Sequence, residues 1–325
     1  MRGGDAVRAT DTQRFSLSRN ARAHLLMLAV VALWGTTFVQ VKDALRDISP
    51  QLFNTLRMLV AFACLAVVYR RQWKRMGWTA LGFGLLAGVC MTFGYIFQTS
   101  GLLYTSATNS AFITGLMVVL VPLLTAIPAL RPPASRAPGW NSWTGALVAF
   151  GGIALLTTPA HTDWARLAHS LNRGDLLTVG CAVGFSFHVI VLAHAAPRVP
   201  FQQIALLMVG VAALLLGAGT GIAEHPFLHP TMRLLMALLV TGILATAAAF
   251  TVQIWAQQIL PATNTALILA LEPVFAWLTA FMLLHERLEV RRVAGALLIL
   301  SGIALTELLH PAQDSTKGAT VFGID

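Results

Sequence analysis

Ten stretches of the chain are predominantly apolar over about the length that a helix needs to cross a lipid bilayer. They cover residues 23–42, 51–69, 78–98, 107–129, 142–159, 174–194, 201–221, 232–255, 263–284 and 292–309. A membrane-spanning helix needs about 20 such residues, because each residue advances the helix by only ~1.5 Å. The pattern therefore predicts an all-α integral membrane protein with ten transmembrane helices. The longest connection, 159–173, is long enough for a surface helix.

The charge content supports a membrane protein. Charged residues make up 11% of the chain and hydrophobic residues 57%, whereas soluble domains carry about 25% charged residues. The net charge of +9 does not indicate a nucleic-acid partner, because the basic residues lie between the apolar stretches, where they orient membrane helices. More of them lie on the side of the N-terminal tail. This bias predicts that both tails, residues 1–22 and 310–325, are cytoplasmic.

The chain repeats itself. "QTSGLLYTSATNSAFI" (98–113) matches "QIWAQQILPATNTALI" (253–268), and "GALVAFGGIAL" (145–155) matches "GALLILSGIAL" (295–305). The two blocks occur in the same order, which predicts two homologous halves of five spans each, over residues 23–159 and 174–309. Because five is odd, the second half is expected to lie inverted in the membrane. Inverted repeats are a common transporter architecture, although channels can also arise by duplication.

The charged residues interpreted as lying well inside the predicted spans are Lys42, Arg57 and Glu272. Insertion scales assign a central charge a cost of about 2.5–3.5 kcal/mol, so such groups are expected to face a wet cavity or one another. Lys42 lies near the end of its span and can instead extend to the interface. For Glu272 the structural alternative is a buried ion pair with Arg57 or Lys42.

Polar residues recur at helical spacing in several spans. Asn264 shares a face with Glu272, and Asn54 shares one with Arg57. Tyr95 belongs to a third stripe, and Gln253 and Gln257 are one turn apart. Such stripes can hold helices together, but several in one bundle favour a polar cavity. The repeated Gln98 and Asn109 are candidate hydrogen-bonding groups there. Pro273 is expected to kink its helix beside Glu272, as a gate.

Enzyme signatures are absent from the sequence. It has no GxxxxGK[ST] phosphate-binding loop, no HExxH and no GxSxG. Its three cysteines, Cys64, Cys90 and Cys181, lie in different apolar stretches without CxxC spacing. We therefore predict no catalytic activity, no metal site and no cofactor.

Several segments resemble the EamA family of the drug/metabolite transporter superfamily. They are "WGTTFVQVK" (34–42), "SPQLFNTLR" (49–57), "ATNSAFITGL" (107–116), "LEPVFAWLTAFMLLHERL" (271–288) and "GALLILSGIAL" (295–305). The resemblance adds Trp34 to the candidate site residues. It implies two inverted five-helix repeats around a central cavity, and export of small metabolites or drugs across the cytoplasmic membrane of a bacterium. The sequence departs from the family pattern at "LRPPASRAP" and "FSFH" (185–188).

These observations predict a secondary transporter that works by alternating access, as a monomer or a homodimer. Arg57 and Lys42 are candidates for attracting an anionic part of a small-molecule substrate or for holding Glu272 in place. Glu272 is the candidate proton carrier, so protons are a candidate coupling ion. The alternative is a channel or facilitator for small polar solutes. The sequence does not identify the substrate.

Overall fold

The computed structural model describes residues 18–133, 135–157, 172–222, 224–284 and 289–308. The helices and short helical turns of the first half are α1 (Arg19–Ala44), α2 (Pro50–Val68), η1 (Arg70–Arg75), α3 (Trp78–Leu102), α4 (Ala107–Thr114), α5 (Met117–Ala126), η2 (Pro128–Leu130) and α6 (Trp140–Thr157). Those of the second half are α8 (Arg173–Ala195), α9 (Phe201–Gly219), α10 (Met232–Leu239), η3 (Val240–Ala248), α11 (Ala249–Ala256), α12 (Ala262–Leu269), α13 (Glu272–Leu284) and α14 (Val290–Leu308). Residues 1–17 of the predicted N-terminal tail, the predicted C-terminal tail, and residues 159–171 of the connection predicted as a surface helix lie outside the described residues. Helix α1 begins at Arg19, within the predicted tail.

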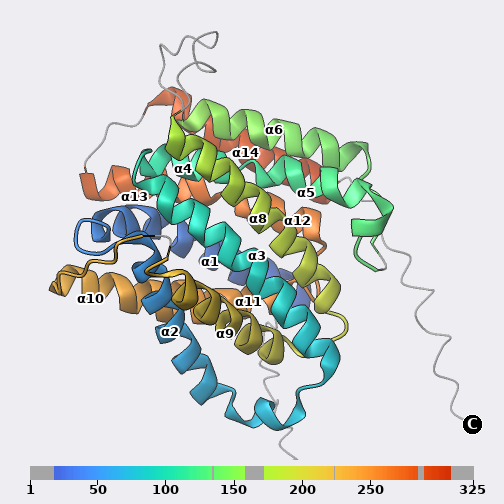
Figure 1. Ribbon diagram of the computed structural model, residues 1–325. Coiled ribbons are helices and arrows are strands. Elements are labelled where there is room, and N and C mark those ends of the chain that lie inside the picture. The colour runs from blue at the N-terminus through green and yellow to red at the C-terminus, as the bar shows by residue number, and fades with distance from the viewer. Residues whose placement is uncertain (1–17, 134, 158–171, 223, 285–288, 309–325) are drawn as a thin grey trace, which may run out of the picture.

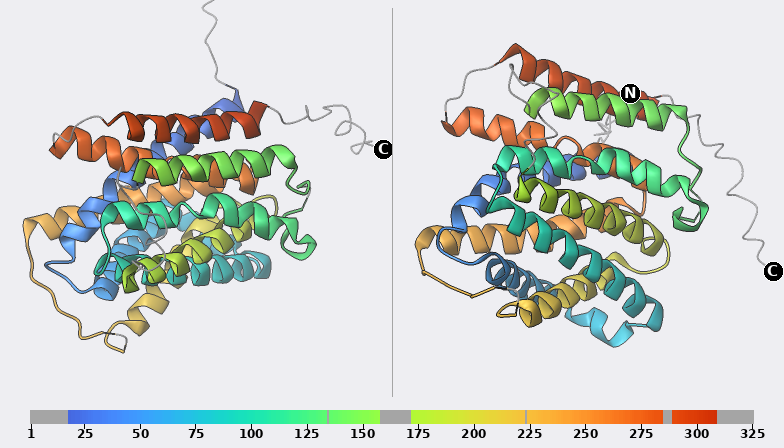
Figure 2. Two further views of the ribbon diagram at one scale, coloured as in Figure 1. Left: turned by 90° about the horizontal axis from the view of Figure 1, so that it is seen from above. Right: turned by 45° about the horizontal axis from the view of Figure 1, so that its top comes forward.

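The protein is a helical bundle (Figures 1 and 2). Within the described residues, eight helices or helix pairs are long and apolar enough to cross a membrane. They are α1, α2, α3, α4 with α5, α8, α9, α10 to α11, and α12 with the first part of α13. Helices α6 and α14, which are not among these eight, lie side by side along one edge of the bundle (Figure 2). The count of ten spans therefore stays a prediction.

The helices of the two halves correspond in length and order. Helices α2 and α9 have 19 residues each, and α4 and α12 have eight. Helix α3 and the continuous segment from α10 to α11 have 25 each. The equivalent helices α4 and α12 both end at a break, at residues 115–116 and 270–271. Equivalent helices with equivalent breaks show that the sequence repeat extends into the backbone.

The predicted span at 263–284 is interrupted, because α12 ends at Leu269 and α13 begins at Glu272. Pro273 is the second residue of α13, where its missing N–H costs nothing, since the first N–H groups of a helix have no partner within it. The first half does not use proline in this way. Pro122 lies inside α5, and the break precedes it at Gly115 and Leu116.

One span of the second half contains a π-helix. This segment, η3, joins α10 to α11. Helix α10 begins 154 positions after α3 begins, and α11 ends 154 positions after α3 ends. A π-helical turn is wider than an α-helical turn and accommodates one residue more. The wide turn distinguishes this span from α3, which is α-helical from Trp78 to Leu102.

Helices α6 and α14 approach through glycines. A Cβ atom on Gly152 would lie 2.6 Å from the carbonyl oxygen of Gly295, and one on Gly145 would lie 2.6 Å from that of Gly302. Small residues allow membrane helices to pack this closely. The neighbouring Gly151 has no atom within 4 Å of its would-be Cβ and faces outward.

We expect Gly152→Ala to destabilise the purified protein by about 1–3 kcal/mol, because the new methyl group must push a neighbouring backbone away. Gly151→Ala is the matched control, since it makes the same chemical change on the open face of the same helix. The measurement is the thermal melting midpoint in detergent. Equal midpoints for the two variants would contradict the close packing of α6 against α14.

Candidate functional site

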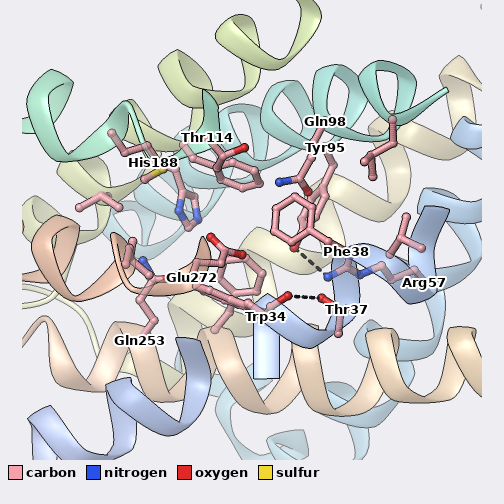
Figure 3. A pocket seen from close by; sticks show the side chains of 17 residues that line it. Trp34, Thr37, Phe38, Arg57, Tyr95, Gln98, Thr114, His188, Gln253 and Glu272 are labelled. Atoms are coloured by element: carbon pink, nitrogen blue, oxygen red, sulfur yellow. Dashed lines mark hydrogen bonds between the residues drawn. The ribbon is translucent and has the colours of Figure 1, made fainter. Parts of the chain in front are cut away.

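A cavity lies at the centre of the bundle (Figure 3); the space free of protein atoms there, including the part open to solvent, is about 620 Å³. Helices of both halves contribute to its wall. The lining residues are Trp34, Thr37, Phe38, Val41, Arg57, Tyr95, Gln98, Leu102, Thr114, Met117, Phe185, His188, Val189, Phe250, Gln253, Leu269 and Glu272. The wall is mainly apolar and aromatic, with a few polar groups, as is usual for sites that bind small molecules.

Most of the lining residues form pairs of equivalent positions in the two repeats. Helices α1 and α8 end 151 positions apart, and the matched sequence blocks of α3 and α11 lie 155 apart. The same spacings relate the lining residues in the pairs Trp34/Phe185, Thr37/His188, Phe38/Val189, Tyr95/Phe250, Gln98/Gln253, Thr114/Leu269 and Met117/Glu272. Each half thus presents the same positions to one cavity.

Arg57 lies at one end of the cavity and is only 4% exposed. Its Nε donates to Thr246 Oγ1 at 2.8 Å, and its Nη2 donates to Tyr95 Oη at 2.9 Å. Its guanidinium carbon also lies 4.4 Å from the centre of the Tyr95 ring, a cation–π distance. Neutral groups therefore hold Arg57, and its positive charge borders the cavity.

The π-helix supplies two contacts to this wall. Thr246, the acceptor for Arg57, donates in turn to the carbonyl oxygen of Thr241 at 2.7 Å. The carbonyl of Ala245 accepts from Trp34 Nε1 at 2.7 Å. The π-helix therefore holds both the buried arginine and the cavity tryptophan through hydrogen bonds.

Glu272 is the first residue of α13 and lines the cavity from the helix break. A helix N-terminus carries a partial positive charge that favours a carboxylate. Helix α1 packs directly on this break, because a Cβ on Gly35 would lie 2.7 Å from the Glu272 carbonyl oxygen. Figure 3 draws no hydrogen bond between Glu272 and the other lining side chains. Its carboxylate is thus available to a ligand or a proton.

Arg57 and Glu272 both border the cavity but do not form an ion pair within the described part of the chain (Figure 3). Arg57 bonds instead to Thr246 and Tyr95. The structural alternative for Glu272, a buried ion pair with Arg57 or Lys42, is not what the structure contains. The two opposite charges face the same space from different helices.

His188 and Gln253 lie near Glu272 in the same view (Figure 3). Both side chains are 1% exposed. His188 Nε2 lies 3.0 Å from the sulfur of Met208, and Gln253 Nε2 donates to Gln257 Oε1 at 3.4 Å. His188 Nδ1 and Gln253 Oε1 are buried without a hydrogen-bond partner among the described residues.

Two of the candidate residues contact the helices that form the cavity but do not line the cavity. Gln257 donates to the carbonyl of Val189 at 2.9 Å. Asn54 is fully buried, donates to the carbonyl of Tyr95 at 3.2 Å and accepts from Thr99 Oγ1 at 3.0 Å. These two side chains join helices of the bundle and do not line the cavity.

The remaining candidates also lie outside the cavity. Lys42 Nζ donates to the carbonyls of Leu102, at 3.0 Å, and Thr105, which places its charge at the C-terminus of α3, where the helix dipole favours a cation. Asn109 is exposed near the start of α4, Asn264 is buried in α12, and Pro273 lines a second cavity beside Trp277.

Thr37, Phe38, Phe185 and Phe250 are among the lining residues that were not selected from the sequence. Three of them are aromatic, which in an apolar span looks like ordinary packing. The sequence repeat could have identified two of them as lining residues, because Phe250 is equivalent to the candidate Tyr95 and Phe185 to the candidate Trp34. His188, at the end of the "FSFH" segment that departs from the family pattern, also lines the cavity.

These features define a multi-pass membrane protein with a central ligand-sized cavity. Residues 21–158 and 172–308 each match the model of the EamA-like transporter family. An uncharacterized transporter of Archaeoglobus fulgidus is 32% identical over 87% of this chain and 85% of its own length. The chain belongs to the EamA-like transporter family and is a membrane transporter.

Other similarities agree with this assignment. A probable amino-acid metabolite efflux pump of Escherichia coli is 24% identical over 86% of this chain and 92% of its own length. A protein of known crystal structure superimposes with a TM-score of 0.71 at 19% identity, over 89% of this chain and 99% of that chain. The structural likeness supports the fold alone.

We expect Tyr95→Phe to destabilise the protein by about 1–3 kcal/mol, because buried Arg57 loses one of its acceptors. Tyr104→Phe is the matched control, since Tyr104 is 52% exposed and surface changes of this kind usually stay within about 0.5 kcal/mol. Melting midpoints in detergent provide the comparison. If the two variants melt alike, the hydroxyl of Tyr95 does not hold Arg57.

Proposed function

We propose that this protein is a secondary transporter that exports small metabolites or drugs across the bacterial cytoplasmic membrane by alternating access, coupled to protons. In this proposal ten helices, including α6 and α14, form two inverted five-helix repeats with both termini in the cytoplasm. The observation that carries the proposal is the pairing of equivalent residues from both repeats around one cavity. Inverted repeats of similar structure can exchange conformations, which opens a central site alternately to the two sides.

Glu272 is the proposed proton carrier. Its carboxylate borders the cavity and has no hydrogen bond to the other lining side chains in Figure 3. It can therefore gain or lose a proton without breaking an existing ion pair. Its position at a break between two short helices also couples it to backbone movement, because discontinuous helices form the moving sites of many transporters.

The direction of transport is proposed from the family and its members. The printed name of the E. coli relative concerns efflux of amino-acid metabolites, which supports export of small metabolites here. The lining supports a solute with an apolar part, since Trp34, Phe38, Tyr95, Phe185 and Phe250 contribute aromatic rings.

Helices at the two ends of the bundle are joined by different kinds of contact. At one end, Asp47 accepts from Arg233 Nη2 at 2.8 Å and from Thr231 Oγ1 at 2.7 Å. Arg233 also contacts Asp43 at 3.3 Å. We call these four residues the Asp47–Arg233 latch; it joins the corner between α1 and α2 to the start of α10.

Glu224 adds to the same closure. Its carboxylate accepts from Ser49 Oγ at 2.6 Å and from the backbone N–H groups of Gln51 and Leu52 at 3.0 Å. The segment after α9 is thereby fixed to the start of α2. The equivalent contact at the other end joins the start of α9 to η1, through Gln203 Nε2 and the carbonyl of Arg75 at 3.3 Å. The contacts between helices are thus ionic at the Asp47–Arg233 end and neutral at the Gln203 end.

We expect Glu272→Gln to abolish proton-driven transport, because the amide cannot carry a proton between the two sides. The exported compounds are first identified by comparing the media of cells that overproduce the protein and cells that lack it. Uptake of one such compound into inside-out vesicles is then measured with and without an imposed proton gradient. Glu289→Gln is the control, since the Glu289 side chain is half exposed and is not among the residues that line the cavity.

Two results of this experiment would contradict the proposal. Unchanged gradient-driven uptake in Glu272→Gln would remove Glu272 as the proton carrier. Uptake that never exceeds the outside concentration, with no response to a proton gradient in the unsubstituted protein, would instead identify a channel or facilitator.

We expect Arg233→Gln to open the latched end more often. A cysteine placed at cavity residue Val41, in a variant whose native cysteines are replaced by alanine, should then react severalfold faster with a membrane-impermeant maleimide. Arg46→Gln is the control, because the ion pair of Arg46 is with the more exposed Asp43, at 3.3 Å. Equal labelling rates in the two variants would show that the latch does not hold this end closed.

The latch should withstand mild acid. The hydrogen bond from Thr231 and that from Arg233 lower the pKa of Asp47 below its usual value. A carboxylate with a lowered pKa contributes its stabilisation above the ordinary aspartate pKa of about 3.9 and loses it as the pH falls further. The latch is therefore expected to stay intact between about pH 7 and 5. Over this range, the rate of maleimide labelling of Val41→Cys should change only as much as the rate for a free thiol. An increase over this range would contradict the assignment.

A further inference from the structure

We propose that the Glu272 end of the cavity binds the protonated amine of the transported solute, with the apolar body of the solute against the aromatic lining. This inference rests on the proposed transport function and adds the chemical class of the ligand. Three side chains form the amine site: Glu272, His188 and Gln253. They come from α13, α8 and α11 and lie together in Figure 3.

The orientation of the Gln253 amide follows from its neighbours. Gln257 Nε2 is committed to the carbonyl of Val189 at 2.9 Å, so Gln257 turns its oxygen toward Gln253. Gln253 Nε2 donates to that oxygen at 3.4 Å. The Gln253 oxygen is then left as a buried acceptor without a donor among the described residues. A buried acceptor without a partner carries a desolvation cost, which a ligand donor would remove.

The tautomer of His188 follows from a similar argument. Its Nε2 lies 3.0 Å from the sulfur of Met208, and a thioether can only accept a hydrogen bond. Nε2 therefore carries the hydrogen, and Nδ1 of the neutral ring is an acceptor. This nitrogen is also buried without a partner in the described residues. The site thus combines a carboxylate, an amide oxygen and an imidazole nitrogen, all of them acceptors.

A protonated amine matches this set of groups. Its three N–H donors can satisfy three acceptors, and its charge complements the Glu272 carboxylate. The aromatic rings of Phe185 and Phe250 also border the cavity and lie 6.1 and 5.4 Å from the His188 ring, centre to centre. Their faces can stabilise a nearby cation. An anionic group would instead be repelled by Glu272.

The opposite end of the cavity lacks this character. Arg57 lies there, donates to Thr246 and Tyr95, and its charge disfavours a cation. The repeat equivalents of the amine site are Met117, Thr37 and Gln98. Methionine has no carboxylate, and the Thr37 hydroxyl donates to the carbonyl of Trp34 at 2.8 Å. Only one half of the pseudosymmetric cavity therefore carries the site, so an amine is held in one orientation.

Equilibrium binding to the purified full chain in detergent tests the inference. Isothermal titration calorimetry is performed at neutral pH with three probes of similar shape: 2-phenylethylamine, 2-phenylethanol and 3-phenylpropionate. We expect the amine to bind about tenfold or more tightly than the alcohol, as a charge-assisted hydrogen bond provides, and the carboxylate to bind most weakly. Tighter binding of the alcohol or the carboxylate would overturn the proposal.

Matched variants locate the preference. Gln253→Leu and His188→Leu are each expected to reduce the amine-to-alcohol affinity ratio by about tenfold. Gln98→Leu is the pseudosymmetric comparison, and it should retain the ratio whatever it does to overall affinity. A ratio that falls equally in Gln98→Leu and Gln253→Leu would overturn the site. The ratio is measured within each folded variant, so altered packing does not imitate the expected result.

This binding experiment is independent of proton coupling. It uses no gradient and no vesicles, so failure of Glu272→Gln to alter proton-driven transport would remove the coupling mechanism and leave the amine preference standing. Conversely, if the protein preferred the carboxylate probe and transport remained proton-driven, the proposal of an amine ligand would be wrong and the proposed transport function would stand.

Discussion

An ionised side chain placed among apolar helices must find water or hydrogen-bonding partners, because its transfer into hydrocarbon costs several kcal/mol. Arg57 and Glu272 meet this requirement differently. Arg57 is surrounded by the hydroxyls of Thr246 and Tyr95 and by an aromatic face, whereas Glu272 depends on the cavity itself and on the start of α13. The cavity, the helix breaks and the close contact of α1 at Gly35 all serve to keep these two groups out of lipid.

Duplication explains the shape of the cavity, and divergence explains its chemistry. Equivalent residues of both repeats line it, but the carboxylate, the imidazole and the guanidinium each occur in one repeat only. The contacts at the two ends differ in the same way, with ionic contacts at the Asp47–Arg233 latch and neutral contacts at Gln203. Under the proposed alternating access, the two conformations would therefore differ in free energy.

The sequence predicted the helices closely, because apolar length alone defines a membrane span; the stretch at 232–255, for example, corresponds to Met232–Ala256. Arg57 and Glu272 were predictable as well, since few roles accommodate a charge at that depth. Residues on polar stripes were harder to assign. Asn54 and Gln257 are polar, like residues that line a cavity. Each instead donates a hydrogen bond to a backbone carbonyl of a neighbouring helix. The periodicity of a sequence shows which residues share one face of a helix. It does not show whether that face points toward the cavity or toward a neighbouring helix, because this depends on how the helices pack.

The π-helical segment η3 has a consequence for how the second repeat tolerates change. A residue added to or removed from a helix rotates everything beyond it by about 100°. Within Val240–Ala248, such a change would turn Phe250 and Gln253 away from the ligand space and would move the groups that bond to Trp34 and Arg57. The length of this wide turn therefore cannot vary independently of the helix face that follows it.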